Sequence, residues 1–342
     1  MRAPNRTTHV KAWSAVYLKE PDNRKVFLEF SMFNQAIKLK VLDLFSGMGG
    51  FSYGFVNTGF SVTGVDISEK AGMAYEKFAR SRFIKMNLNS ENVTGDFEVV
   101  IGGPPCRPWS AVNQSKSRGS THRDFSLFGR FFDNVLSIKP KIFILENVPL
   151  LSHDPEFSAQ LSRAENAGYS TAHRIFRYSD FGAATSRRRL IAVGLLNGSG
   201  EGFLNDVDFF KASPRDVRSA ISAYRYAGRN SIPDHVWPNL HTVEKYREKY
   251  QSGKFGWRIL DWNGPAPSFG NVMKTYILHP DSDLDNYEFR PVSVLEVSRI
   301  MGFNRGFYFP ESIGMGMRYQ MLVDSVSPVF SDVLARAVLR WL

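Results

Sequence analysis

The sequence predicts an α/β protein with a doubly wound, mostly parallel sheet and a second, smaller irregular domain. Three observations lead to this fold class. From residue 39 onward, short apolar runs alternate with segments long enough for crossover helices. Turns rich in glycine or proline follow two of these runs, as they do where parallel strands end. The alternation stops after Leu196, and a stretch without clear periodicity begins.

Six apolar runs account for the sheet, and the segments between them include crossover helices. We expect strands at 40–44, 62–66, 82–86, 97–101, 141–145 and 190–195, and helices at 67–80 and 128–138. Residues 1–36 form a predicted N-terminal extension, with a possible hairpin around the strand-like run 26–30. The first domain is predicted at 37–196 and the irregular domain at 197–288. A helical segment at 289–342 is expected to return to the first domain.

Composition restricts the class of protein. A hydrophobic content of 43% over 342 residues is enough for a globular core. Lysine and arginine exceed aspartate and glutamate by ten (43 − 33), which slightly favours a nucleic-acid partner over a merely basic protein. A single cysteine excludes a disulfide framework and favours a cytoplasmic location. We expect no signal peptide and no membrane span, because the sequence lacks apolar segments of the required kind and length. We expect no metal site, because the seven histidines are scattered.

The only cysteine, Cys106, follows a Gly-Gly-Pro-Pro turn at 102–105 that ends the apolar run 97–101. A free cysteine is more often a small buried hydrophobe than a nucleophile. This one lies on a stiff turn at the carboxyl edge of a predicted parallel sheet, where ligands and reacting groups collect. Together with the sequence around it, that position favours a nucleophilic thiol.

A glycine-rich turn at 43–51 follows the first predicted strand. Such a turn lets backbone N–H groups approach a ligand, and it begins a helix whose N-terminus favours negative charge. Asp66 ends the next strand about 20 residues on, where an acidic side chain reaches ribose hydroxyls. A tight turn without a ligand and a helix-capping Asp66 are the structural alternatives. The pair favours an adenosine-containing cofactor.

Two further groups belong to the same predicted edge. Glu146 ends the buried run at 142–145, so its carboxyl should be shielded from water and have a raised pKa. Arg187 and Arg189 precede the last strand with one residue between them, so they should share a face while Arg188 points away. Helix capping by Glu146 and a solvated arginine run are the structural alternatives.

In this order, these residues resemble the C5-cytosine DNA methyltransferase family of bacteria and phages. The match covers the turn at 43–51, the Pro-Pro-Cys turn, the Glu-Asn-Val at 146–148 and the Arg-x-Arg at 187–189. Pro267-Ser268 resembles a short Pro-Thr signature of the target-recognition domain. The family's penultimate block is matched by Arg290, Glu296, Arg299, Gly302 and Phe303.

The resemblance implies a Rossmann-like fold and methyl transfer from S-adenosylmethionine to C5 of a flipped-out cytosine in duplex DNA. Cys106 would attack C6, Glu146 would hold the N3 edge, Arg189 would hold O2, and Arg187 would support the thiol end. No metal is implied. The cofactor residues carried over from the family are Asp43, Phe45, Gly47, Met48, Gly49, Gly50, Asp66, Ile67, Asn87, Leu88, Pro104, Asp324, Ser325 and Val326.

The resemblance also makes 37–196 a catalytic domain and 197–288 a target-recognition domain. We expect a monomer in the cytoplasm, in the bacterial nucleoid or a phage-infected host, with a cognate restriction endonuclease as a possible partner. Trp237, Lys254 and Trp257 could contact DNA or simply pack and solvate. The expected DNA contacts are Arg107, Ser110, Lys116, Arg118, Arg123, Arg258 and Lys274, several of them in a basic loop after Cys106 that also contains His122.

The chain departs from the family pattern at three places. Asn87 stands where an Asp is common, and Thr185 replaces the Gln before the arginine pair. Val323-Asp324 replaces a Gly-Asn in the last block, which predicts weakened or altered cofactor handling without loss of the fold. The alternative functions are cytosine methylation of tRNA and a catalytically weak, regulatory DNA-binding homologue.

Overall fold

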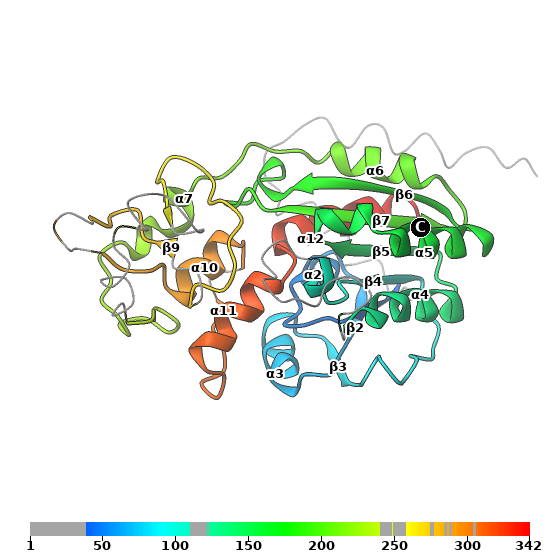
Figure 1. Ribbon diagram of the computed structural model, residues 1–342, viewed down its shortest axis with the longest axis horizontal. Helices are drawn as coiled ribbons and strands as arrows, with labels where there is room; N and C mark the ends of the chain where they lie inside the picture. Colours follow the sequence, from blue (N-terminus) through cyan, green and yellow to red (C-terminus); the bar gives the residue numbers. More distant parts are fainter. Residues whose placement is uncertain are drawn as a thin grey trace, which may run out of the picture. The chain divides into compact units, whose positions relative to one another are not determined.

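A computed structural model describes residues 39–109, 122, 124–239, 248, 258–273, 277–283, 286, 289–303 and 306–342. Its centre is a seven-stranded sheet in the order β3-β2-β1-β4-β5-β7-β6 (Figure 1). The first five strands in the chain are parallel, and the last two are antiparallel to their neighbours. The predicted mixed α/β class with a mostly parallel sheet is therefore confirmed.

The strands coincide closely with the apolar runs of the sequence. β4 and β5 are buried along their whole length, as expected of strands covered on both faces. The strands of this sheet are β1 (Lys40–Leu44), β2 (Ser61–Asp66), β3 (Arg82–Lys85), β4 (Val99–Gly102), β5 (Ile142–Asn147), β6 (Ser170–Arg177) and β7 (Arg188–Leu195). β6 is absent from the predicted strands because this edge strand consists mostly of polar and charged residues, without a continuous apolar run or a regular alternation.

Helices cover both faces of the sheet. One core joins the sheet to α2 (Gly50–Asn57), α6 (Gly200–Asp208) and α12 (Pro328–Leu339). The opposite core joins it to α4 (Ser126–Ile138) and α5 (Pro155–Asn166), through rings such as Phe128, Phe131 and Phe157. Asp154 caps the N-terminus of α5, since its side chain accepts from the Glu156 N–H, and Pro155 occupies the first turn.

A third core packs α3 (Glu69–Phe78) with the short elements of the later chain. It includes α7 (Val217–Ile221), α10 (Val294–Ile300) and α11 (Met315–Asp324), together with β9 (Ile277–Leu278), which pairs with β8 (Arg258–Ile259). Ser293 and Glu296 form a reciprocal capping box at the start of α10. The remaining short helices are η1 (Arg107–Trp109), η3 (Pro149–His153), η4 (Tyr178–Asp180) and η5 (Ser222–Tyr224).

The elements after Leu196 do not all leave the sheet. α6 packs against β6, β7 and α12, so the helices that cover the sheet include one that follows residue 196 (Figure 1). The division into 37–196, 197–288 and 289–342 stays a prediction. The predicted extension at 1–36, with its strand-like run, lies outside the described residues.

Among the described residues, no helix combines the length and apolar character needed to span a bilayer. The same residues contain no cluster of three or more histidine, cysteine or acidic side chains arranged to hold a metal ion.

The close approach of α2 and α12 depends on Gly54. A Cβ at this position would lie 2.2 Å from the backbone of Ser331 and Asp332, and the Gly54 N–H donates to the Ser331 hydroxyl at 3.2 Å. Because both obstacles are held in α12, they cannot rotate away.

We therefore expect Gly54→Ala to lower the free energy of unfolding by about 2 kcal/mol through overpacking, measured by urea denaturation. Gly129→Ala in α4 is the matched control, because its Cβ would meet only the Gln160 side chain at an ordinary 3.4 Å. It should leave stability unchanged or raise it, since alanine has the higher helix propensity. Equal stability of the two variants would contradict this view of the contact.

Candidate active site

The direction of β7 brings the predicted site residues to one edge of the sheet. β4 and β5 are parallel and end at Gly102 and Asn147, whereas β7 is antiparallel to β5 and begins where β5 ends, with Asn147 opposite Leu190. The arginines at the start of β7 therefore meet the carboxyl ends of the parallel strands. A sequence pattern places residues along a strand, but this meeting depends on the strand's direction.

Cys106 lies on a turn that several hydrogen bonds hold. The Trp109 N–H donates to the Cys106 carbonyl at 3.0 Å, which begins η1. The Asn147 side-chain amide donates to the Pro104 carbonyl at 3.0 Å and ties the turn to the end of β5. The Trp109 indole donates to Asp154 at 2.7 Å. Cys106 as a whole residue is half-buried on this fixed turn.

Glu146 is buried among cationic and hydroxyl donors. Arg189 Nε lies 2.8 Å from Glu146 Oε1, and both side chains are about nine-tenths buried. The Tyr178 hydroxyl donates to the same oxygen at 3.4 Å. Burial raises the pKa of Glu146, while the two nearby guanidinium groups and the Tyr178 hydroxyl act in the opposite direction. Arg187 is buried, Arg188 is exposed, and Arg189 is intermediate.

Arg187 is an unusual cation in this cluster. Burial and the neighbouring Arg189 lower its pKa to about 10, so it remains charged at neutral pH. Its Nε atom has no hydrogen-bond partner among the described residues, although it is buried. A buried donor without a partner is costly, and a polar ligand atom could satisfy it.

The electrostatics at Cys106 are mixed. Burial raises the pKa of the thiol, and Arg189 and Arg187 oppose that effect. Asp324 and Glu146 both raise it further through their negative charges. The resting group is therefore a thiol, with two arginines in place to stabilise the thiolate when it forms.

The turn after β1 has an unusual backbone. Phe45, Gly47 and Gly49 have positive φ angles of 59°, 52° and 89°, so left-handed residues alternate along it. Such alternation makes a concave nest of backbone N–H groups, and α2 begins directly after it. The Gly47 N–H donates to Asp66 at 3.0 Å, which fixes the turn against the end of β2. The Ser46 hydroxyl has no partner among the described residues.

Asp43 lies behind this turn. It is buried at the end of β1, and its carboxylate accepts a 2.6 Å hydrogen bond from Ser52. The Ser52 hydroxyl also lies 2.8 Å from the Tyr75 hydroxyl. Burial raises the pKa of Asp43 to about 7. Asp43 therefore supports the turn from inside the core.

The C-terminal segment completes the turn. A Cβ at Gly50 would lie 2.0 Å from the Ser325 hydroxyl and 2.4 Å from the Val326 carbonyl, so α2 and the end of α11 are in close contact. Val323, which replaces the family's glycine, is buried in the same core as Met48. Asp324 is exposed, and both of its oxygens accept from the Gln320 side chain at 2.8 Å.

A sequence model of the C-5 cytosine-specific DNA methylase family matches residues 39–340. The chain belongs to this family. It is 26% identical over 331 residues to the Type II methyltransferase M.FnuDI of Fusobacterium nucleatum, covering 88% of this chain and 94% of that protein. It is 27% identical to M.BsuFI of Bacillus subtilis, covering 90% and 74% of the two chains.

Solved structures agree in fold. The Entamoeba histolytica methyltransferase EhMeth superposes with a TM-score of 0.69 at 18% identity, covering 89% of this chain and 99% of that one. The S. pombe Dnmt2 methyltransferase superposes with a TM-score of 0.67 at the same identity and coverage. The C5-cytosine resemblance and the Rossmann-like architecture are thus confirmed, and the methylase is an enzyme of the DNA (cytosine-5-)-methyltransferase class.

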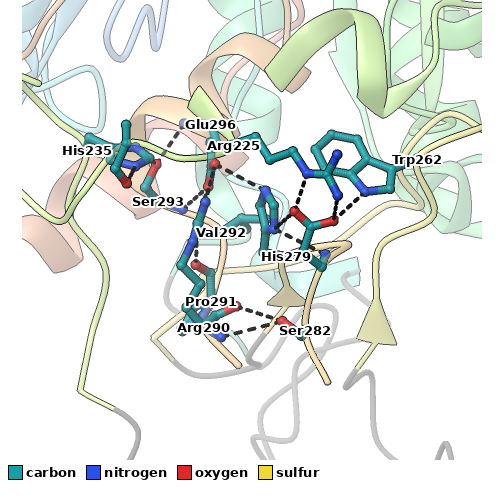
Figure 2. A network of polar contacts seen from close by, with 12 residues as sticks. Arg225, His235, Trp262, His279, Ser282, Arg290, Pro291, Val292, Ser293 and Glu296 are labelled. Atoms are coloured by element: carbon teal, nitrogen blue, oxygen red, sulfur yellow. Dashed lines mark hydrogen bonds and ion pairs between the residues drawn. The ribbon is translucent and has the colours of Figure 1, made fainter. Parts of the chain in front are cut away.

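The penultimate block of the methylase forms a polar network in the later chain (Figure 2). Glu296 accepts from Arg290 through two contacts of 2.8 Å, and its carboxylate is wholly buried. His279 Nε2 lies 3.6 Å from Glu296, and burial lowers the pKa of His279 to about 4, so this imidazole is neutral. On the other side of His279, Asp281 accepts hydrogen bonds from the side chains of Arg225 and Trp262. The network joins Arg225, Trp262, His279, Asp281 and Arg290 to Glu296 of α10.

The predicted DNA contacts of the methylase are only partly visible. Arg107 and Arg258 are exposed on η1 and β8. Trp237 packs under Arg290, with the guanidinium 4.8 Å from the indole ring. This contact supports the alternative that Trp237 packs within the protein. The remaining candidates lie outside the described residues: Ser110, Lys116, Arg118, Arg123, Lys254, Trp257 and Lys274.

The other cofactor candidates differ in accessibility. Ile67 is 62% exposed beside Asp66, and Asn87 is exposed with its side-chain oxygen accepting from the Asn89 N–H. That oxygen can still accept a second hydrogen bond. Leu88 and Pro104 are buried, so their contribution is to shape the surface beneath.

Sequence reasoning missed three supporting side chains. Tyr178 contacts Glu146, and Tyr75 contacts the Ser52 that binds Asp43. Asp154, 48 positions after Cys106, holds the Cys turn through Trp109. No local motif identifies them, because each acts across the fold rather than along one element.

The single cysteine allows a direct test of the charge beside it. Asp324→Asn removes a negative charge that raises the pKa of Cys106, so the thiolate fraction at pH 7.5 should increase. We expect alkylation of Cys106 by iodoacetamide to become roughly two- to threefold faster, in proportion to that fraction.

Asp261→Asn is the matched control, because Asp261 is also exposed but does not contribute to the Cys106 pKa. Its alkylation rate should equal that of the wild type. A slower or unchanged rate in Asp324→Asn would show that Asp324 exerts no net field at the thiol.

Proposed function

We propose that the methylase transfers a methyl group to C5 of a flipped-out cytosine in duplex DNA through a covalent bond between Cys106 and C6. The observation that carries this proposal is the convergence of Cys106, Glu146 and the arginine pair at one edge of the sheet. The glycine turn and the Cys turn follow neighbouring strands, β1 and β4. A nucleophile, a buried acid and a methyl donor could therefore meet at one point.

The chemistry requires each of these groups. C5 of cytosine is a poor nucleophile, and addition of the Cys106 thiolate to C6 makes C5 an enamine carbon. Protonated Glu146 donates to N3 as the C6–S bond forms, so negative charge does not build up on the ring. After C5 is methylated, a base removes the C5 proton, the C6–S bond breaks and the thiolate leaves. The N3 proton returns to Glu146.

The arginines support both ends of this reaction. We assign Arg189 to the O2 side of the base, in addition to its contact with Glu146, and Arg187 to the thiol end. The buried Nε of Arg187 is a donor that still requires an acceptor. Both cations also favour the thiolate over the thiol at Cys106.

S-adenosylmethionine fits the turn after β1 and supplies the methyl group when it is bound. Asp66 would accept from the ribose, Phe45 and Ile67 would border the adenine, and the backbone of Gly47 and Gly49 would approach the methionine part. Two features support this placement: the alternating left-handed residues, and a Ser46 hydroxyl without a partner. Space at Gly47 is open, since a Cβ there would meet nothing within 4 Å.

The DNA side of the proposal rests on charge and on family membership. A duplex hides C5 and C6, so the target base must leave the stack before Cys106 can reach it. We assign the basic loop after Cys106 to this step and residues 197–288 to sequence recognition. The relatives named as Type II methyltransferases support a role beside a restriction endonuclease. We further propose a monomer that acts in the cytoplasm.

Trapping on modified DNA tests the proposal. A cytosine with fluorine at C5 cannot lose a proton after methylation, so elimination fails and the enzyme should remain bound. We expect wild-type protein with S-adenosylmethionine to form a denaturation-resistant adduct with 5-fluorocytosine duplex DNA, seen by gel shift and mass spectrometry. Cys106→Ala should form none.

Glu146→Gln should form the adduct at least tenfold more slowly, because it cannot donate a proton to N3. A parallel assay with tRNA separates the two nucleic-acid substrates. Binding of DNA by wild-type protein without any adduct would contradict the enzymatic proposal and favour the regulatory alternative.

A further inference from the structure

Tyr178 is a buried hydroxyl that the proposed reaction has not used. It begins η4, directly after β6, and its side chain is completely buried. Its ring packs against Phe330 of α12 with 5.0 Å between centroids. Its backbone N–H donates to the Arg187 carbonyl at 2.9 Å. The position of Tyr178 is thereby tied to the arginine pair.

The hydroxyl and Arg189 share one oxygen of Glu146. Tyr178 donates to Oε1 at 3.4 Å, and Arg189 Nε approaches the same Oε1 at 2.8 Å. The other oxygen, Oε2, lies towards the Cys turn, 3.2 Å from the point where a Cβ of Gly103 would be. The two carboxylate oxygens thus have different surroundings: one faces fixed donors and the other faces the turn that carries Cys106.

We propose that Tyr178 is a positioning residue for Glu146, which makes Oε1 the permanent acceptor and leaves Oε2 as the oxygen that exchanges a proton with the cytosine. The proposal rests on the proposed function and deepens it. A carboxylic acid whose Oε1 accepts two hydrogen bonds carries its proton on Oε2. When Oε2 donates to N3, the carboxylate that remains is stabilised at Oε1, and the proton later returns to Oε2.

The charged groups around Glu146 set the direction of the expected effect. Arg189 and Arg187 face it from the start of β7, Tyr178 from η4 and Cys106 from the turn after β4. Burial raises the pKa of Glu146, while the arginines and the Tyr178 hydroxyl lower it. Loss of the hydroxyl must therefore raise that pKa, because one stabilising contact to the ionised form disappears.

Tyr178→Phe removes the hydroxyl and keeps the ring that packs on Phe330. Tyr169→Phe is the matched control, because Tyr169 is also buried but donates to the Pro140 carbonyl at 2.8 Å and forms no hydrogen bond with Glu146. We expect the pKa of Glu146 to rise by roughly half a unit in Tyr178→Phe and to be unchanged in Tyr169→Phe. Carbon-13 NMR of glutamate-labelled protein measures it, with Glu146→Gln for assignment.

Methyl transfer provides the second readout. In Tyr178→Phe, the decline of kcat at high pH should move upward with the Glu146 pKa, and maximal kcat should fall several-fold while KM for DNA stays constant. 3-Fluorotyrosine at position 178 is a stronger hydrogen-bond donor. It should lower the pH at which kcat declines and raise maximal kcat. A merely structural role would lower stability without moving the pH profile.

The two proposals fail in different ways. If wild-type protein forms no adduct with 5-fluorocytosine DNA, the proposed function fails, while the NMR titration still decides whether Tyr178 acts on Glu146. If the adduct forms but Tyr178→Phe leaves the Glu146 pKa unchanged, the positioning role is wrong and the reaction stands.

Discussion

Burial of the Glu146 carboxyl beside two arginines is the constraint on which the site depends. Removing these charges from water is costly, and the cost is offset only where geometry and hydrogen bonds are good. β5 supplies Glu146 and the antiparallel β7 supplies the arginines, so the register of two strands sets the geometry. The same cations compensate the negative field at Cys106. One arrangement of charge thus acts on both Glu146 and Cys106.

The glycine-rich turn after β1 depends on parts of the chain that are distant in sequence. Asp43 and Ser52 hold it from the core, while Ser325 and Val326 close it at Gly50. This explains why the fold accommodates Val323: its side chain enters the same apolar core as Met48. The substitution at Asp324 is different, because that charge is exposed and acts on Cys106 through space.

Local patterns in the sequence were sufficient for the parallel strands and for the order of the motifs. Buried parallel strands have nearly continuous apolar runs, so β1, β4 and β5 were readily recognised. β6 was missed because most of its residues are polar or charged and show neither a continuous apolar run nor a regular alternation. The contact between Tyr178 and Glu146 could not be predicted, since it joins η4, which follows β6, to β5, and β7 lies between these two strands in the sheet. Side-chain spacing along a strand carries no information about such a partner.

The close packing of α2 on α12 also bears on the time course of biosynthesis. Gly54 and Ser331 are 277 positions apart and in direct contact. At a translation rate of about 5–20 residues per second, roughly 15 to 60 s pass between the synthesis of these two residues. During this time α12 is not yet available, and part of the apolar surface of the early strands stays uncovered. Ser325 and Val326 close the glycine-rich turn after β1 at Gly50, so this turn is complete only after the end of α11 and the residues that follow it have been synthesised.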